Sequence, residues 1–169
     1  MTPSSGYSPV EIDAIQARWG LRFPPDLVEA LRRRRRLLDG TGAFDWLLAD
    51  PAEIRRRLDW PFEGLWFDVG HNDLWDPAWG DRSGDADGGQ ARLRSIVAAA
   101  PRLIPLYGHR YLPEEPCEAG NPVFSVWQSD IIVYGTSLPD WRLRETEGWD
   151  ARPWPSSLKR IRFWSDLAG

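Results

Sequence analysis

Two apolar runs near the centre of the chain constrain its fold most strongly, because only two residues separate them. Residues 122–127 (PVFSVW) and 130–134 (DIIVY) are rich in β-branched and aromatic residues, with Gln128-Ser129 between them. This pattern predicts a tight antiparallel hairpin. The run Leu103–Tyr107 predicts a further strand, and Pro105 within it indicates an edge position or a bulge. We therefore expect a mainly antiparallel sheet at the centre of the fold.

Helix signals flank these strands on both sides. Ser8, Pro9 and Glu11 provide a cap, a first-turn proline and an acid at the third helical position, and Gly20 ends the predicted helix. Further helices are predicted from Leu27 to near Gly40, from Asp50 to about Leu58, over Gln90–Ala100, from Ser137 to about Glu145 and over Ser156–Leu167. Residues 43–49 predict a short strand, and the aromatic stretch 60–80 predicts a strand with long connections. Helices at both ends around a central sheet indicate an α+β fold.

Length and composition fit one globular domain over residues 1–169. The chain has 169 residues, of which 42% are hydrophobic and 27% charged, and no repeat or composition shift marks a second domain. Its polar start, MTPSSGYSP, lacks the apolar segment of a secretory signal. The longest apolar runs, such as IVAAA, fall far short of the ~18 residues of a membrane span. We expect a cytoplasmic protein without a membrane segment.

Acidic residues are concentrated in two stretches, although the net charge is only −4. Residues 63–90 carry seven acids and one arginine, and residues 111–150 carry eight acids and two arginines. This pattern suits a cationic partner and disfavours nucleic acid as the main ligand. The alternative is that both acidic stretches form an ordinary solvated surface without a partner. The basic run Arg32–Arg36 would point in all directions on a helix and form no flat strip. The candidate partner-binding acids lie in two expected loops: Asp81, Asp85, Asp87, Glu114, Glu115 and Glu118.

Tryptophan is unusually frequent, with eleven in the chain. Trp60, Trp66, Trp75 and Trp79 fall close together in the sequence. One role for this cluster is packing helices onto the sheet. The other is an aromatic groove in which a partner docks, because tryptophan is enriched at interface hot spots. We take Trp75 or Trp79 as the candidate anchor of a partner.

Residues suited to metal binding are few. The chain holds two histidines, His71 and His109, and one cysteine, Cys117. A zinc site usually needs three or four well-placed ligands, and these three residues are widely spaced. The acidic loop fits a calcium-binding template only in part, because the last position is Arg94 where a bidentate glutamate is required. We predict no metal and no cofactor.

His109 is the strongest catalytic candidate, since Cys117 follows eight residues later and the two side chains would form a Cys–His pair if they met. Three neighbouring acids disfavour a thiolate there, and no helix start follows the cysteine to stabilise one. The alternative is that His109 ends a strand and bonds the backbone or a neighbouring acid, and we favour it. We predict that the protein is not an enzyme, and a small hydrolase using His109 is the remaining catalytic hypothesis.

Three motifs in order resemble the SUKH superfamily, in its bacterial Smi–Knr branch, over about residues 10–167. The first is Gly20–Asp26 (GLRFPPD), after the opening helix, and the second is Trp60–Val69 (WPFEGLWFDV) with His71-Asn72, Trp75 and Trp79-Gly80. The third and most specific is Leu103–Pro113 (LIPLYGHRYLP), continued by Gly120–Val126 and Asp130–Gly135.

This resemblance implies an α+β binding scaffold without catalytic residues. Many bacterial members resemble immunity proteins that neutralise toxins of intercellular competition, often nucleases, and fungal relatives act as regulatory scaffolds. We therefore expect a binding protein whose partner is a basic toxin domain such as a nuclease. An intracellular regulatory scaffold is the alternative. The sequence leaves the partner's identity and the oligomeric state open.

Overall fold

The computed structural model describes residues 5–82 and 84–169 and confirms the expected α+β class. Four helical segments precede the sheet: α1 (Pro9–Trp19), α2 (Pro25–Arg33), α3 (Pro51–His71) and, after the 3₁₀ turn η1 (Pro77–Trp79), α4 (Ala86–Ala99). The strands are β1 (Leu103–Tyr107), β2 (Arg110–Pro113), β3 (Val123–Trp127) and β4 (Asp130–Gly135), and α5 (Leu138–Glu147) and α6 (Trp164–Leu167) follow. Within the described ranges, no helix combines the length and apolar character needed to cross a membrane.

The strands form one antiparallel sheet in the order β1-β2-β3-β4. The predicted hairpin is confirmed, because Trp127 pairs with Asp130 across Gln128-Ser129. β1 is an edge strand, and its register shifts just after Pro105, as a proline in a strand requires. β2 is a four-residue strand that returns directly from β1, and it was not predicted as a separate strand.

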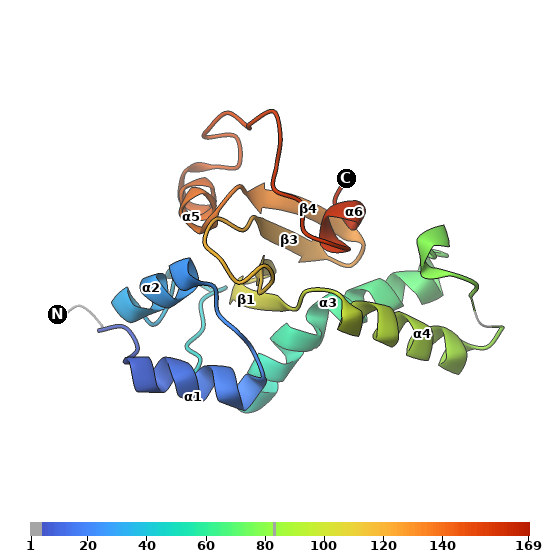
Figure 1. The fold of residues 1–169 in the computed structure, drawn as a ribbon, viewed down its shortest axis with the longest axis horizontal. Coiled ribbons are helices and arrows are strands. Elements are labelled where there is room, and N and C mark those ends of the chain that lie inside the picture. The colour runs from blue at the N-terminus through green and yellow to red at the C-terminus, as the bar shows by residue number, and fades with distance from the viewer. Residues whose placement is uncertain (1–4, 83) are drawn as a thin grey trace.

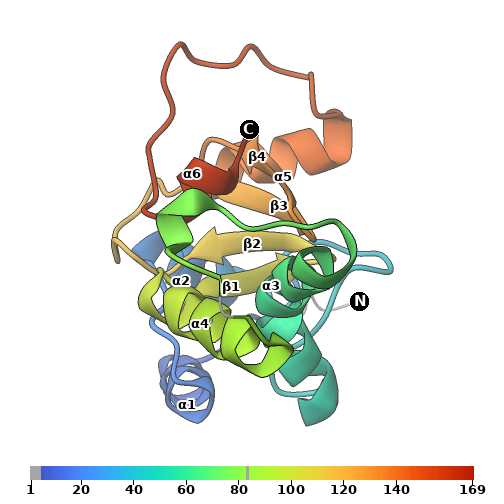
Figure 2. The same ribbon diagram turned by 90° about the vertical axis from the view of Figure 1, so that its right-hand side faces the viewer.

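Helices cover both faces of the sheet, so alternate strand residues enter two different cores (Figures 1 and 2). Ile104, Leu112 and Val123 pack with side chains of α1, α2 and α5. Leu103, Tyr111 and Phe124 face the opposite way and pack with α4, α6 and the second half of α3. The first half of α3 joins the other core through Ile54. This long helix therefore spans both cores.

The prediction that the third helix ends near Leu58 is wrong, as is the strand expected within residues 60–80. The helix continues through Pro61 to His71. Proline removes the N–H that would bind the carbonyl four residues earlier, which is that of Arg57. The hydroxyl of Tyr111 donates a hydrogen bond to this carbonyl at 2.7 Å. The buried side chains of Leu65 and Val69 then hold the second half of the helix against the sheet.

Four other predictions also differ from the structure. α2 ends at Arg33, so the run Arg32–Arg36 leaves the helix instead of extending it. Residues 43–49 form turns and not a strand, because the Asp45 carboxylate accepts hydrogen bonds from the N–H groups of Leu47 and Leu48. The last helix covers only Trp164–Leu167, and α4 begins earlier than predicted, at Ala86.

Candidate protein interface

Three aromatic side chains from separate elements meet at the surface. Trp60 lies on α3, His109 in the turn between β1 and β2, and Trp127 at the end of β3. The rings of Trp60 and Trp127 are 5.3 Å apart edge to face, and those of His109 and Trp127 are 5.5 Å apart. Trp127 is 52% exposed and Trp60 is 36% exposed. We call Trp60, His109 and Trp127 the aromatic patch.

The aromatic patch is held by the contact between α3 and the tip of the β3–β4 hairpin. A Cβ on Gly64 would lie 2.8 Å from the Cα of Gln128, so only glycine permits this approach. One turn further along α3, the Asp68 carboxylate accepts hydrogen bonds from the backbone N–H (2.8 Å) and hydroxyl (2.5 Å) of Ser129. The indole N–H of Trp60 donates to the Val126 carbonyl at 2.9 Å. Both tryptophans therefore stand on fixed backbone.

The charges around the aromatic patch are partly neutralised, and Arg56 forms no ion pair with any residue that the structure describes. Burial lowers the pKa of His109, the Arg110 guanidinium lowers it further, and Glu145 opposes both. The ring is therefore uncharged at neutral pH. A hollow of about 360 Å³ lies beside the patch, and Arg57 at its wall pairs with Glu53 at 2.9 Å. An uncharged aromatic surface next to a hollow suits an apolar side chain of a partner.

The first predicted acidic loop is exposed and lies at the start of α4. Asp85 caps this helix by accepting a hydrogen bond from the Gly88 N–H at 2.5 Å. Arg82 ties the loop to the end of α3, donating to the Val69 carbonyl and to Asp73 at 3.1 Å each. Asp81 and Asp87 form no ion pair with any residue the structure describes. Their charges therefore face solvent.

The second predicted acidic loop lies at the other end of α4. Glu115 approaches Arg162 at 3.7 Å, and Arg162 donates to the last-turn carbonyl of Ala99. Glu118 pairs with Lys159 at 2.5 Å. Glu114 accepts from the Arg22 backbone N–H, and burial raises its pKa. Since α4 has 14 residues, about 20 Å of helix separates the two loops, and the fold does not bring them together.

The two tryptophans predicted as anchors sit in different surroundings. Trp79 is only 4% exposed and stacks against Phe163, so it packs in the core. Trp75 is half-buried and donates its indole N–H to the Gly80 carbonyl at 2.8 Å. Trp60, Trp127 and Trp149 are the more exposed tryptophans, and the first two lie side by side. A signal was present in the sequence, because a bulky residue directly before a two-residue turn lies at the end of the hairpin.

The structure separates His109 from Cys117. They flank β2 at opposite ends, and four residues of strand span about 13 Å. The cysteine sulfur lies 3.7 Å from the Phe23 carbonyl oxygen. The His109 ring contacts Trp127, and among the described residues it forms neither of the expected hydrogen bonds, to the backbone or to a neighbouring acid. Among the described residues, no three His, Cys, Asp or Glu side chains are grouped to hold a metal ion.

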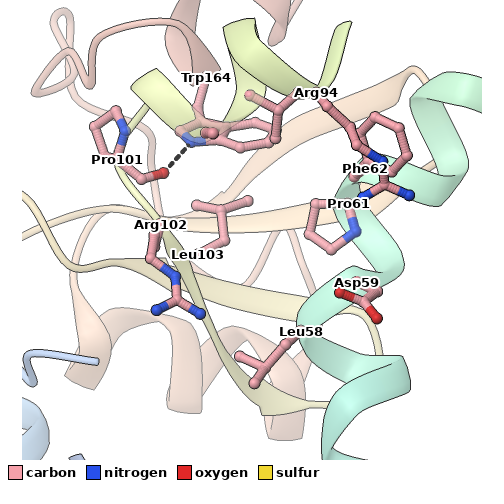
Figure 3. A pocket seen from close by; sticks show the side chains of 11 residues that line it. Leu58, Asp59, Pro61, Phe62, Arg94, Pro101, Arg102, Leu103 and Trp164 are labelled. Atoms are coloured by element: carbon pink, nitrogen blue, oxygen red, sulfur yellow. Dashed lines mark hydrogen bonds between the residues drawn. The ribbon is translucent and has the colours of Figure 1, made fainter. Parts of the chain in front are cut away.

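A second hollow, of about 330 Å³, lies between α3, α4 and the start of β1 (Figure 3). Trp164 closes one side and donates its indole N–H to the Pro101 carbonyl. Two arginines stand at the rim. Arg94 lies over the Phe62 ring at 4.1 Å, and Arg102 donates to the Gly20 carbonyl at 2.6 Å. Both are engaged within the chain, so this hollow is a weaker candidate than the aromatic patch.

Comparison of the chain with protein-family models, with curated proteins and with solved structures found no match. Among the described residues, Trp60, His109 and Trp127 form an exposed aromatic patch on fixed backbone, and a solvent-facing acidic loop at the start of α4 is tied to the end of α3 by Arg82.

Proposed function

We propose that this protein is a non-catalytic binding protein that neutralises a toxin of intercellular competition, as an immunity protein does. The observation that carries the proposal is the aromatic patch, in which Trp60 and Trp127 are exposed although α3 and the hairpin hold them firmly. Exposed tryptophans on rigid elements are typical of interface hot spots. Among binding proteins, the resemblance to the SUKH superfamily favours an immunity protein.

The acidic loop at the start of α4 supports a basic partner such as a nuclease. Arg82 connects this loop to Val69, nine residues beyond Trp60, which corresponds to about 13 Å along α3. One interface of standard size, roughly 1,200–2,000 Å² in total, includes both features if the partner reaches around the end of α3. Asp81 and Asp87 would speed association with a basic surface, and the tryptophans would supply affinity. Such a contact inhibits by covering the toxin's substrate-binding face.

Affinity capture from the native host, followed by mass spectrometry, tests this proposal. Wild-type protein should retain a toxin domain, and purified toxin should lose activity in the complex. Trp127→Ala should weaken the affinity about 30-fold or more, the effect of a hot-spot residue. Val10→Ala is the matched control, because Val10 is 77% exposed on α1 and contributes nothing to the patch. Equal affinity of Trp127→Ala and wild type would contradict the assigned site.

Charge reversal separates the roles of the two acidic loops. The double variant Asp81→Lys/Asp87→Lys should slow association and weaken its salt dependence. The matched variant Glu115→Lys/Glu118→Lys should have a smaller effect, because those carboxylates already pair with Arg162 and Lys159. If only the second variant slows association, the interface lies at the other end of α4.

The same capture experiment distinguishes the alternative functions. A regulatory scaffold would retain cellular proteins without inhibiting any of them, and its gene would have no toxin gene beside it. A hydrolase would show turnover that is lost in His109→Ala, which would contradict the proposal.

A further inference from the structure

The β4 edge of the sheet is available for pairing. β4 is the last strand in the order, and β3 is its single neighbour in the sheet. Hydrogen-bonded and non-hydrogen-bonded pairs alternate along an antiparallel ladder. Because the pair Trp127–Asp130 closes the two-residue turn, Ser125–Ile132 is hydrogen-bonded and Phe124–Val133 is not. The N–H and C=O of Val133 therefore point to the free edge.

A segment after α5 arches over this edge without pairing to it. Between α5, on one face of the sheet, and α6, on the other, the chain makes a wide arch beyond β4 (Figure 2). We call residues 149–160 the arch. In the described chain, its backbone makes no hydrogen bond to β4. It passes beyond the edge strand without pairing to it, so the outward groups of Val133 stay unpaired, whereas the N–H of Ile131 donates to the Ser129 carbonyl at 3.0 Å.

Both ends of the arch are anchored. Arg144 of α5 is 1% exposed and donates to the carbonyls of Trp149 (2.6 Å) and Arg152 (3.1 Å). Its guanidinium also lies 3.8 Å from the centre of the Trp154 ring. Beyond the arch, Ile161 is buried at 2% exposure. The arch is therefore held away from β4 by a buried cation at one end and a core residue at the other.

The space between the arch and β4 forms a groove of about 580 Å³. Ile132 and Val133 line one wall. The other wall holds the apolar residues Trp149, Trp154 and Leu158 together with the polar residues Ser156, Ser157, Lys159 and Arg160. Trp149 and Leu158 are 41% and 38% exposed. The indole N–H of Trp154 is buried and has no hydrogen-bond partner among the described residues. The groove thus combines the outward main-chain groups of Val133 with the exposed apolar side chains of Trp149 and Leu158.

We propose that an extended segment of a partner polypeptide enters this groove and adds to β4 as a fifth strand. Only another polypeptide main chain offers the repeating N–H and C=O groups that a strand edge requires. Alternate side chains of the segment contact the tryptophan wall, so they are apolar. A second whole copy of this protein fits poorly, because the arch stands over the edge. This site is separate from the aromatic patch.

A displayed library of random twelve-residue peptides, selected against the full chain, supplies the probe. The best peptide is then synthesised with a single backbone N-methyl group at each position in turn. Strand addition predicts a two-residue period, in which every second N-methyl group weakens binding about tenfold or more and the intervening ones do not. A flat profile, a helical period or the failure to select any peptide would overturn the proposal. The N-methyl groups are placed on the peptide and the protein stays wild type, so the folding of the protein does not affect the result.

Variants of the protein locate the peptide. Val133→Pro removes the outward N–H and should abolish binding, whereas Val133→Thr keeps this group and should retain binding within about threefold. Trp127→Ala should leave peptide binding unchanged. Peptide binding that is lost in Trp127→Ala and kept in Val133→Pro would place the peptide on the aromatic patch and overturn this proposal without affecting the proposed function. A dimer in ultracentrifugation that Val133→Pro disrupts would likewise overturn it, in favour of a second copy.

Discussion

The hydroxyl of Tyr111 in β2 replaces a hydrogen bond that Pro61 removes from α3. It donates to the carbonyl of Arg57, four residues before the proline, at 2.7 Å. Tyr111 is 1% exposed, so its hydroxyl shields the Arg57 carbonyl from water. The bond allows one helix to run from the first core into the second, and thereby places Trp60 beside the hairpin tip.

Tyr111→Phe should destabilise the fold by about 1–3 kcal/mol, because the Arg57 carbonyl loses its donor. Pro61→Ala restores the helical N–H to that carbonyl, so Tyr111→Phe should cost less in the Pro61→Ala background. Urea unfolding of the two single variants and the double variant forms the cycle that measures this coupling. Strictly additive losses would mean that Tyr111 does not compensate for the proline.

Gly64→Ala should destabilise the protein by about 1–3 kcal/mol, because the new methyl group meets the Gln128 backbone. Gly70→Ala is the matched control on the same helix. A Cβ at Gly70 meets no atom within 4 Å, so this variant should stabilise α3 by about 0.5–1 kcal/mol. Thermal unfolding compares the two, and near-ultraviolet circular dichroism should report displacement of the Trp60–Trp127 pair in the first alone. If both substitutions changed the unfolding temperature equally, Gly64 would not be in close contact with the Gln128 backbone.

Asp68→Asn should lower stability at neutral pH by about 2 kcal/mol, the contribution of hydrogen bonds to a charged group. Burial acts to raise the pKa of Asp68, but the hydrogen bonds from Ser129 and Asn72 outweigh it and hold the pKa below its usual value. Stabilisation by a group with a lowered pKa is present above about pH 4 and is lost as the pH falls through the folded-state value. The gap between wild type and variant, measured by urea unfolding, should therefore narrow below pH 4. A gap that stays constant to pH 2 would show that the charge of Asp68 plays no part.

His109 should titrate below the ordinary histidine value of about 6.5. Because its folded pKa is lowered, the unfolded chain binds the proton first, and this residue reduces stability as the pH falls below about 6.5. Trp127→Ala removes a ring that packs against His109, so it should expose the imidazole to solvent and raise the pKa of His109. Nuclear magnetic resonance of the imidazole Cε1–H signal measures both values, with His71→Gln to assign the resonances. A midpoint at or above 6.5 in wild type would contradict the burial of the ring.

Short-range features were predicted where their signals are local. The Ser8 cap and Gly20 bound α1 as expected, and its capping box is complete. Residue pattern and turn length correctly predicted the hairpin of β3 and β4. The exposed acids of the first loop were also predicted, because neighbouring charged residues in a Gly/Asp loop rarely become buried.

The sequence by itself determined the class of fold, the position of most strands and the acidic character of two loops, since these follow from spacing within a few residues. Tertiary structure alone decided that α3 continues through Pro61, that Trp79 is buried while Trp127 is exposed, and that the two acidic loops lie at opposite ends of α4. The physical reason is that each of these outcomes depends on a partner distant in sequence. The Tyr111 hydroxyl, the Phe163 ring and the Arg162 guanidinium reach their contacts only once the chain has folded.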